Sequence, residues 1–203
     1  MALFFCQLFM KIEATTLEGE HVRLEPLAPK HLNDLSSFAF DPDLWTVNSF
    51  SILNAEQLSA YIDARQKALL AGIELGFATI EKATQKAVGS TRFMNIAVND
   101  KRVEIGGTFI GKPWQRTVVN TEAKYLMLRH AFEVWNCNRV ELKTDRLNER
   151  SQTAILRIGA QLEGIMRSHM ITWTGRVRDS VYFSVTSEEW PEVKEELERK
   201  LAG

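Results

Sequence analysis

The sequence is poor in cysteine, with only Cys6 and Cys137 among 203 residues. They lie far apart and belong to no Cys-x-x-Cys pair. This scarcity argues against a disulfide-rich secreted scaffold and fits a reducing compartment, so a cytoplasmic protein is expected. No grouping of His, Cys, Asp and Glu has the spacing of metal ligands, and we therefore expect no metal.

The chain also lacks an excess of charge of either sign. Its 25 Lys and Arg and 26 Asp and Glu residues leave a net charge of -1. That balance excludes the positive field that drives nonspecific binding to nucleic acid, so no nucleic-acid partner is expected. The hydrophobic fraction of 45% and the charged fraction of 25% are those of an ordinary globular protein. This length predicts one domain with its own core.

Long hydrophobic runs are missing as well. The most apolar stretch, from Met1 to Phe9, is too short to span a bilayer and lacks the basic start and cleavage site of a signal peptide. No membrane association is therefore expected. Residues 1–16 are interpreted as an N-terminal extension to a domain over 17–203, with Met10 as an alternative translation start.

Hydrophobic periodicity divides the rest of the chain into strands and helices. Alternating polar and apolar residues predict strands over 21–26, 75–81, 87–96, 103–110, 139–144, 162–170 and 177–185. Apolar residues at helical spacing predict helices over 29–40, 55–71, 121–135 and 192–201. Asn148 has the side chain of an N-cap, and it predicts a short helix that Gly159 ends.

The order of these elements is typical of a mixed α/β sheet in one domain. The strands over 75–110 are spaced as an antiparallel meander. The strand, helix and strand over 103–144 predict a parallel crossover. Gly106 and Gly107 interrupt a strand, where glycine indicates a bulge, a close approach by substrate or tight packing against a helix.

The stretch from Val103 to Lys124 contains a polar loop between a strand and a helix. Backbone amides at a helix start, together with the helix dipole, favour an anion such as a pyrophosphate. Arg116 would add positive charge there. The alternative is an inert capped helix start, because most turns of this kind bind nothing.

Four tracts carry a resemblance to a known family. They are NTEAKYLMLRHAFE, the DRLNERS turn from Asp145 to Ser151, the IGA ending of the next helix, and GRVRDSVYFSV. With them the chain, from about Leu17 to Trp190, resembles the GNAT N-acetyltransferases, in particular the branch with the ribosomal-protein N-terminal acetyltransferases. The resemblance implies a single-domain acyl-CoA N-acyltransferase fold: a mostly antiparallel sheet with one splayed parallel pair and flanking helices.

The resemblance also implies a phosphate-binding loop for the cosubstrate acetyl-CoA. Gln115 matches the first position of the family loop, whereas Val118 and Asn120 stand where the family has small residues, usually glycine. Glycine permits close backbone approach, so the loop either follows a different path with side-chain donors or binds the cosubstrate more weakly. The residues expected to contact acetyl-CoA are Phe109, Ile110, Gln115, Arg116, Thr117, Val118, Val119, Asn120, Thr121 and Asn148.

For catalysis, the resemblance implies Glu104 as a general base that acts through water, because an ammonium must lose a proton before its nitrogen attacks a thioester. It implies that Ser151 protonates the departing thiolate. Backbone amides at Phe109 and Ile110 would polarise the thioester carbonyl.

The residues themselves allow plainer interpretations. Glu104 could pair with Arg102 or another base, and the spacing of Asn148 and Ser151 predicts only helix capping. Tyr182, the alternative acid, lies in an alternating strand where a packed aromatic is the ordinary explanation.

Three residues are expected near the acceptor: Trp45 in an aromatic-bearing loop, and His169 and Arg178 around a terminal hairpin. A small core for Trp45 and solvated surface charge for the hairpin are the alternatives. His130 is interpreted as a hydrogen-bonded core histidine. Cys137 has no base beside it, so no cysteine nucleophile is expected.

These observations lead us to expect an N-acetyltransferase that moves the acetyl group of acetyl-CoA directly to a primary amine. The acceptor would be a protein N-terminal α-amine or a small-molecule amine, and no motif selects between them. The alternative is a non-catalytic GNAT-like module that binds acyl-CoA or a partner, which the substituted loop favours. A homodimer is left open.

Overall fold

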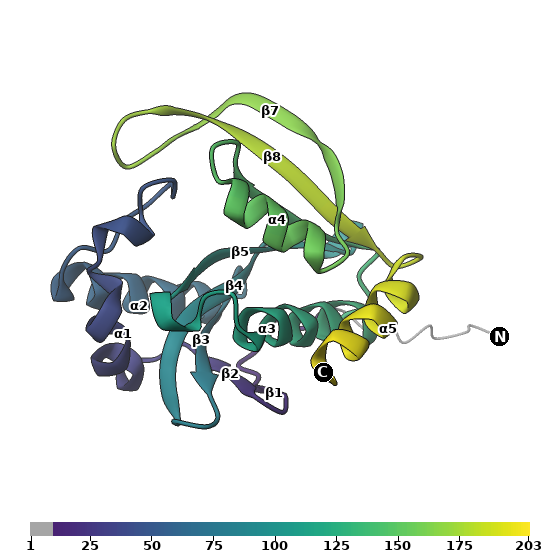
Figure 1. Cartoon of the computed structure of the whole chain (residues 1–203), viewed down its shortest axis with the longest axis horizontal. Coiled ribbons are helices and arrows are strands. Elements are labelled where there is room, and N and C mark those ends of the chain that lie inside the picture. The colour runs from purple at the N-terminus through teal and green to yellow at the C-terminus, as the bar shows by residue number, and fades with distance from the viewer. Residues whose placement is uncertain (1–9) are drawn as a thin grey trace.

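The computed structural model describes residues 10–203 (Figure 1). Met1 to Phe9, most of the interpreted extension, lie outside this part of the chain. From Met10 onward the segment is packed against the domain. Met10 itself is buried in the main core, and the carbonyl of Lys11 accepts a hydrogen bond of 3.1 Å from the indole of Trp135.

The centre of the molecule is a mixed sheet, as expected, and it has eight strands where seven were predicted. Its strands lie in the order β1-β2-β3-β4-β5-β6-β8-β7, and every neighbouring pair is antiparallel except β5 and β6. The strands are β1 (Leu17–Glu18), β2 (Val22–Pro26), β3 (Leu75–Glu81), β4 (Lys86–Ala97), β5 (Arg102–Ile110), β6 (Arg139–Asp145), β7 (Gln161–Ile171) and β8 (Val177–Thr186).

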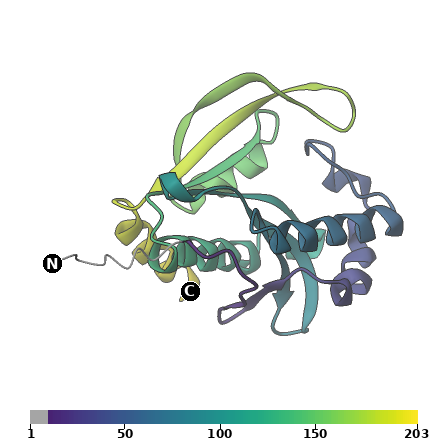
Figure 2. The same ribbon diagram turned by 180° about the vertical axis from the view of Figure 1, so that it is seen from behind.

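Five helices cover the two faces of this sheet. They are α1 (Leu32–Ala39), α2 (Ala55–Leu70), α3 (Val118–Arg129), α4 (Glu149–Arg157) and α5 (Trp190–Leu201). The larger apolar core includes residues of α3, α4 and α5, and a second core lies under α1 and α2. Figures 1 and 2 view the molecule from opposite sides, with α3 in front of the sheet in the first and α2 in front in the second.

The predicted parallel crossover is confirmed, and its two strands separate along their length. β5 and β6 are paired only from Arg102 to Glu104, opposite residues 139–141. β5 then continues to Ile110, and in the described part of the chain its far half pairs with β4 alone. Because an unpaired strand edge presents free N–H and C=O groups, this splay leaves backbone donors of β5 for a ligand.

One predicted boundary was wrong in a way that affects the site. The crossover helix begins at Val118 rather than Thr121, because the Thr117 hydroxyl caps it by accepting a hydrogen bond of 3.3 Å from the amide of Val119. Residues 118–121 therefore form the first turn of α3 and not a loop. The last turn, over 130–134, is a π-helix, and the two-residue strand β1 was not predicted.

Candidate active site

Two bulges shape the middle of β4 and β5. Gly107 has a φ of +58°, and the register of the two strands shifts beside it, which confirms the predicted bulge. A second shift falls between Met94 and Ala97, where Asn95 has a φ of 50°. The second bulge turns the Asn95 side chain toward β5, and its amide donates a hydrogen bond of 2.8 Å to Oε2 of Glu104.

Glu104 is held just before the point where β5 leaves β6. It is 2% exposed, and its Oε2 also accepts a hydrogen bond of 2.9 Å from Nζ of Lys143 on β6. Its basic partner is therefore Lys143, not Arg102, which instead pairs with Glu141 at 3.2 Å. A buried, paired carboxylate at the start of the splay can serve as a proton acceptor whose position is fixed by two donors.

Polar side chains continue from Lys143 across the sheet. Nζ of Lys143 lies 5.8 Å from the centre of the Tyr182 ring, and the Tyr182 hydroxyl lies 3.4 Å from Nε2 of His169. Nδ1 of His169 is 3.0 Å from Oγ of Ser180. Burial, followed by the charges of Lys143 and Arg178, lowers the pKa of His169 below its ordinary value, which favours the neutral imidazole. Tyr182 is thus part of a polar cluster and not only a packed aromatic.

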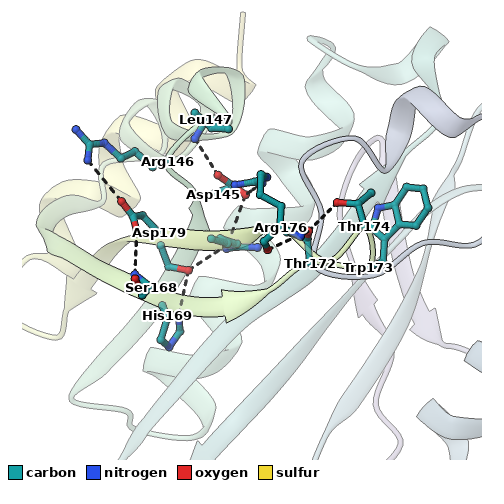
Figure 3. Close-up of polar contacts among 12 residues, drawn as sticks. Asp145, Arg146, Leu147, Ser168, His169, Thr172, Trp173, Thr174, Arg176 and Asp179 are labelled. Atoms are coloured by element: carbon teal, nitrogen blue, oxygen red, sulfur yellow. Dashed lines mark hydrogen bonds and ion pairs between the residues drawn. The ribbon is translucent and has the colours of Figure 1, made fainter.

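The terminal hairpin of β7 and β8 is anchored by Asp145 (Figure 3). Oδ1 of Asp145 accepts a hydrogen bond of 2.9 Å from the amide of Leu147, and Oδ2 pairs with the guanidinium of Arg176. Nε of Arg178 is 3.9 Å from the same oxygen and donates a hydrogen bond of 3.1 Å to Ser180. Burial lowers the pKa of Arg178, but arginine stays charged in proteins. Asp145 therefore joins the turn before α4 to the hairpin.

This arrangement changes the expectation for Arg178. The side chain is 6% exposed and lies 3.9 Å from Asp145, a carboxylate that it shares with Arg176, so it stabilises the hairpin and is not the solvated surface charge considered as the alternative. Asp179 on β8 also fixes the hairpin. Its carboxylate accepts a hydrogen bond of 2.8 Å from the amide of Ser168 on β7 and lies 3.5 Å from the guanidinium of Arg146. Asp179 was expected in a charged cluster around the hairpin, whereas Asp145 was not singled out from the sequence as a functional residue. The signal for Asp145 was its place at a strand end before a cap residue.

Trp45 does not lie on a substrate surface in this structure. Its side chain is fully buried in the second core against Phe109, with ring centres 5.2 Å apart, and its indole donates a hydrogen bond of 2.8 Å to the carbonyl of Ala39. The alternative of a small core beneath the loop is therefore the one observed. The carbonyl of Trp45 accepts a hydrogen bond of 2.9 Å from the indole of Trp173 at the hairpin tip. The two sides of the active-site face meet at this contact.

The expected phosphate site is the N-terminus of α3. Arg116 precedes the Thr117 cap with a φ of 63°, and its side chain is exposed. Gln115 is turned inward: its amide donates a hydrogen bond of 3.0 Å to the carbonyl of Ile110 and accepts one of 2.7 Å from Arg150 on α4. The amides of the first α3 turn and Arg116 can bind an anion, whereas Gln115 joins the two sides of the splay.

Within that first turn the expected contact residues have different environments. Val119 and Thr121 are buried, while Val118 and Asn120 are half-buried. The Thr121 hydroxyl accepts a hydrogen bond of 3.4 Å from Arg157 of α4. Side chains larger than glycine are thus accommodated by packing against neighbouring elements, and backbone amides are the groups that a ligand would reach.

Asn148 and Ser151 form the predicted helix cap. Oδ1 of Asn148 accepts a hydrogen bond of 3.0 Å from the amide of Ser151, and the side chain of Ser151 is half-buried at the start of α4. The backbone of Phe109 and Ile110 lies on β5 across the splay. The two candidate cosubstrate walls are therefore β5 on one side and the β6–α4 turn on the other.

The other residues considered from the sequence lie away from the splay. His130 is a core residue, but its Nε2 is buried without a hydrogen-bond partner among the described residues, so the predicted hydrogen bond is not found at that atom. Burial raises the pKa of the Cys137 thiol to about 12, which suits an inert cysteine. Over residues 10–203 no group of three or more His, Cys, Asp or Glu could hold a metal. The helices in that range include none long and apolar enough to cross a membrane.

Comparison with known proteins supports the same fold. The model of the acetyltransferase (GNAT) domain matches residues 21–161. The crystal structure of a GCN5-related N-acetyltransferase from Brucella melitensis is similar with a TM-score of 0.85 and 32% identity, covering 93% of this chain and 86% of that chain.

Two further solved structures are more distant in sequence. RimJ of Mycobacterium smegmatis in complex with CoA-disulfide has a TM-score of 0.81 at 16% identity and covers 95% of this chain and 97% of that chain. A Vibrio cholerae structure assigned as a ribosomal-protein-serine acetyltransferase has a TM-score of 0.74 at 20% identity, with 85% and 97% covered. These two likenesses show the fold alone. The domain match and the Brucella relative, taken with the splayed sheet, establish that the chain belongs to the GNAT family of N-acetyltransferases.

Proposed function

We propose that this acetyltransferase transfers the acetyl group of acetyl-CoA directly to a primary amine, either a protein N-terminal α-amine or a small-molecule amine. The observation that carries the proposal is the buried Glu104 at the point where β5 and β6 separate. Acetyl-CoA supplies the thioester. The new bond joins the amine nitrogen to the acetyl carbon, the thioester C–S bond breaks, and CoA leaves as its thiol.

The residues present fit a CoA-shaped ligand at two places. Among the described residues the Phe109–Ile110 end of β5 has no strand partner toward β6, so its free backbone groups can receive the amide groups of the pantetheine arm. The Ile110 carbonyl is not one of them, because it accepts a hydrogen bond from Gln115. The α3 N-terminus and Arg116 offer amides and positive charge to the pyrophosphate. Asn148 borders the other side of the splay. The RimJ neighbour, described in complex with CoA-disulfide, supports this assignment.

Glu104 is the proposed general base. It would accept the amine proton at its carboxylate through a water molecule, while Lys143 and Asn95 keep the carboxylate in place. An α-amine has a pKa of roughly 8, so it needs less help than a lysine amine near 10.4. Ser151 is the proposed donor of a proton to the leaving sulfur, from its hydroxyl at the start of α4.

The Vibrio cholerae neighbour supports a peptide α-amine as the acceptor, since that protein is assigned as a ribosomal-protein-serine acetyltransferase. A cytoplasmic location suits that substrate class. A binding module without turnover is the second candidate, and the observation that favours it is the presence of Val118 and Asn120 where the family loop has small residues.

Calorimetric titration with acetyl-CoA tests the proposal. We expect binding by the wild type and weaker binding by Arg116→Ala, with Arg199→Ala on the exposed surface of α5 as the matched control. Free thiol should then appear with an amine acceptor and disappear in Glu104→Gln. Binding without thiol release from any amine would establish the acyl-CoA-binding module instead. No binding at millimolar acetyl-CoA would exclude the enzyme and leave a non-catalytic module that binds a partner.

A further inference from the structure

A cavity of about 560 Å³ lies on the α2 side of the sheet, between α2, the segment before it and β4. Its walls include Phe50, Tyr61, Arg65 and Arg92. No part of the proposed CoA site uses these residues. The cavity is large enough for the N-terminal residues of a peptide or for a small amine.

The cavity reaches the bulge of β5. The Arg92 guanidinium lies against Gly107: a Cβ added to Gly107 would be 2.9 Å from Cζ of Arg92. A Cβ added to Gly106 would be 3.0 Å from Oε1 of Glu104. Arg92 is the strand partner of Gly106, so the guanidinium and the Glu104 carboxylate flank the same two glycines. The glycines leave space there that any larger residue would fill.

The aromatic wall connects the cavity to the acyl-transfer strand. Tyr61 packs edge-on against Phe109 of β5 with ring centres 5.9 Å apart, and Phe50 stacks on Tyr61 at 5.7 Å. The Arg65 guanidinium lies over the Tyr61 ring, 5.3 Å from its centre. These contacts hold Arg65 at the cavity wall, since a cation over an aromatic face is attracted to it.

The charge of this wall is only partly compensated. Nη1 of Arg65 is 2.9 Å from Oε2 of Glu74, and Nε of Arg92 is 3.6 Å from the same oxygen. In the described chain this single carboxylate serves both guanidiniums. Nε of Arg65 and Oε2 of Glu74 are both buried without a hydrogen-bond partner among the described residues, so the ion pair does not satisfy either group fully. Both guanidiniums line the cavity and share this one carboxylate, so an anion in the cavity would gain charge-assisted contacts with them.

We propose that the acceptor is a primary amine that also carries a carboxylate, which Arg92 and Arg65 bind while the amine lies at the Gly106–Gly107 bulge opposite Glu104. The inference rests on the proposed function and names the chemical class of its acceptor. A carboxylate matches the planar donor pair of a guanidinium better than a neutral amide does. The carboxylate can belong to an acidic side chain near a peptide N-terminus or to a free amino acid.

Matched acceptors test this inference. The probes are two C-terminally amidated hexapeptides that differ only in Glu or Gln at the second position, and the free amino acid alanine with its neutral carboxamide, alaninamide. With acetyl-CoA at saturation, thiol release should give a kcat/KM at least about 10-fold higher for the acidic member of a pair, the size expected from one charged hydrogen-bonded contact. Preference within the peptide pair or the amino-acid pair identifies the source of the carboxylate.

Arg92→Gln and Arg65→Gln should each reduce the ratio between acidic and neutral probes toward one, and Arg199→Gln should leave it unchanged. Calorimetric binding of the Glu hexapeptide without acetyl-CoA gives a second readout and should weaken in the same two variants. Far-UV circular dichroism checks that the variants are folded. The two arginines are on different elements, so the test fails only if both the Arg92→Gln and the Arg65→Gln variants misfold.

Three results would overturn the inference: equal use of acidic and neutral probes by the wild type, a ratio that persists in both arginine variants, or thiol release with neither acidic probe. These outcomes are distinct from failure of the proposed function. A protein that binds no acetyl-CoA overturns the proposed function, and this inference falls with it. A protein that acetylates neutral amines as well as acidic ones keeps the proposed function and loses only this inference.

Discussion

The indole N–H of Trp173 donates a hydrogen bond of 2.9 Å to the carbonyl of Trp45, although 128 residues separate them in sequence. It joins the tip of the β7–β8 hairpin to the segment between α1 and α2. Figures 1 and 2 show the hairpin extending beyond α4 toward that segment. The active-site face is therefore bordered on one side by α2 and on the other by the hairpin, with this contact between them.

Trp173→Phe should loosen the hairpin tip while the rest of the fold is preserved. The change removes one hydrogen bond, worth about 1 kcal/mol, from a side chain that is 43% exposed. We expect faster amide hydrogen exchange over residues 166–178 and a higher KM for the acceptor, with an unchanged KM for acetyl-CoA. Ile171→Ala, on the same hairpin, is the control. Identical exchange in both variants would mean that the Trp45 contact does not order the tip.

Lys143→Met should destabilise the protein because it leaves the Glu104 carboxylate buried with Asn95 as its remaining donor. Removing one partner of a buried ion pair typically costs about 3 kcal/mol or more. The double variant Glu104→Gln with Lys143→Met removes both charges and should recover most of that loss. Chemical unfolding of the two single variants and the double variant measures the coupling. Additive losses would show that the pair is not energetically linked.

The Glu104→Gln variant also tests the role of Glu104 in catalysis. Glu104→Gln keeps a side chain of the same shape but cannot accept a proton, so we expect kcat to fall by roughly 100-fold or more with little change in the KM for acetyl-CoA. A lost general base lowers the rate without weakening cosubstrate binding. An unchanged kcat would transfer the proton-accepting role to water or to another group.

The order of the elements and the crossover could be predicted because they depend on local periodicity. Strand, helix and strand over 103–144 carry their own patterns, and the two glycines on β5 had a bulge among their three interpretations. The partner of Glu104 could not be predicted in this way. Lys143 is 39 residues away, and Asn95 reaches the carboxylate only because a second bulge shifts the register of β4. Such a shift has no glycine to mark it.

Trp45 shows the other limit of sequence reasoning. An aromatic residue in a segment without periodicity fits a pocket wall and a small core equally well, and only the packing of α1 and α2 decides between them. The arginines of the cavity have the same difficulty, since Arg65 lies on a helix and Arg92 on a strand. They approach one common carboxylate only when α2 packs on β3 and β3 pairs with β4.

Variants of Asn148 distinguish capping from cosubstrate binding. Asn148→Ala removes the acceptor for the Ser151 amide and should cost about 1 kcal/mol, whereas Asn148→Ser keeps a capping oxygen and should restore most of the stability. Serine lacks the amide N–H₂ group. We therefore expect Asn148→Ser to bind acetyl-CoA more weakly than the wild type by calorimetry. Wild-type affinity in the serine variant would reduce the role of Asn148 to capping.

Lys124 gives the stability a distinct dependence on pH. It is buried, with Nζ 2.9 Å from the Thr91 hydroxyl and 2.7 Å from the Thr108 hydroxyl, and burial lowers its pKa from 10.5 to about 7. The unfolded chain therefore binds more protons than the folded one between pH 7 and about 10.5. The cost of burying the charge is complete below pH 7, decreases as pH rises through this range and is absent above it.

Lys124→Met should remove this dependence. The methionine variant is expected to be more stable than the wild type at pH 6. The difference should shrink as pH rises from 7 to 10, by up to about 1.4 kcal/mol per pH unit. Urea unfolding at matched pH values measures it, and Lys67→Met on α2 is the control for an exposed lysine. Parallel stability curves for the wild type and Lys124→Met would show that the buried amine keeps its proton in the folded state, because then both states titrate together.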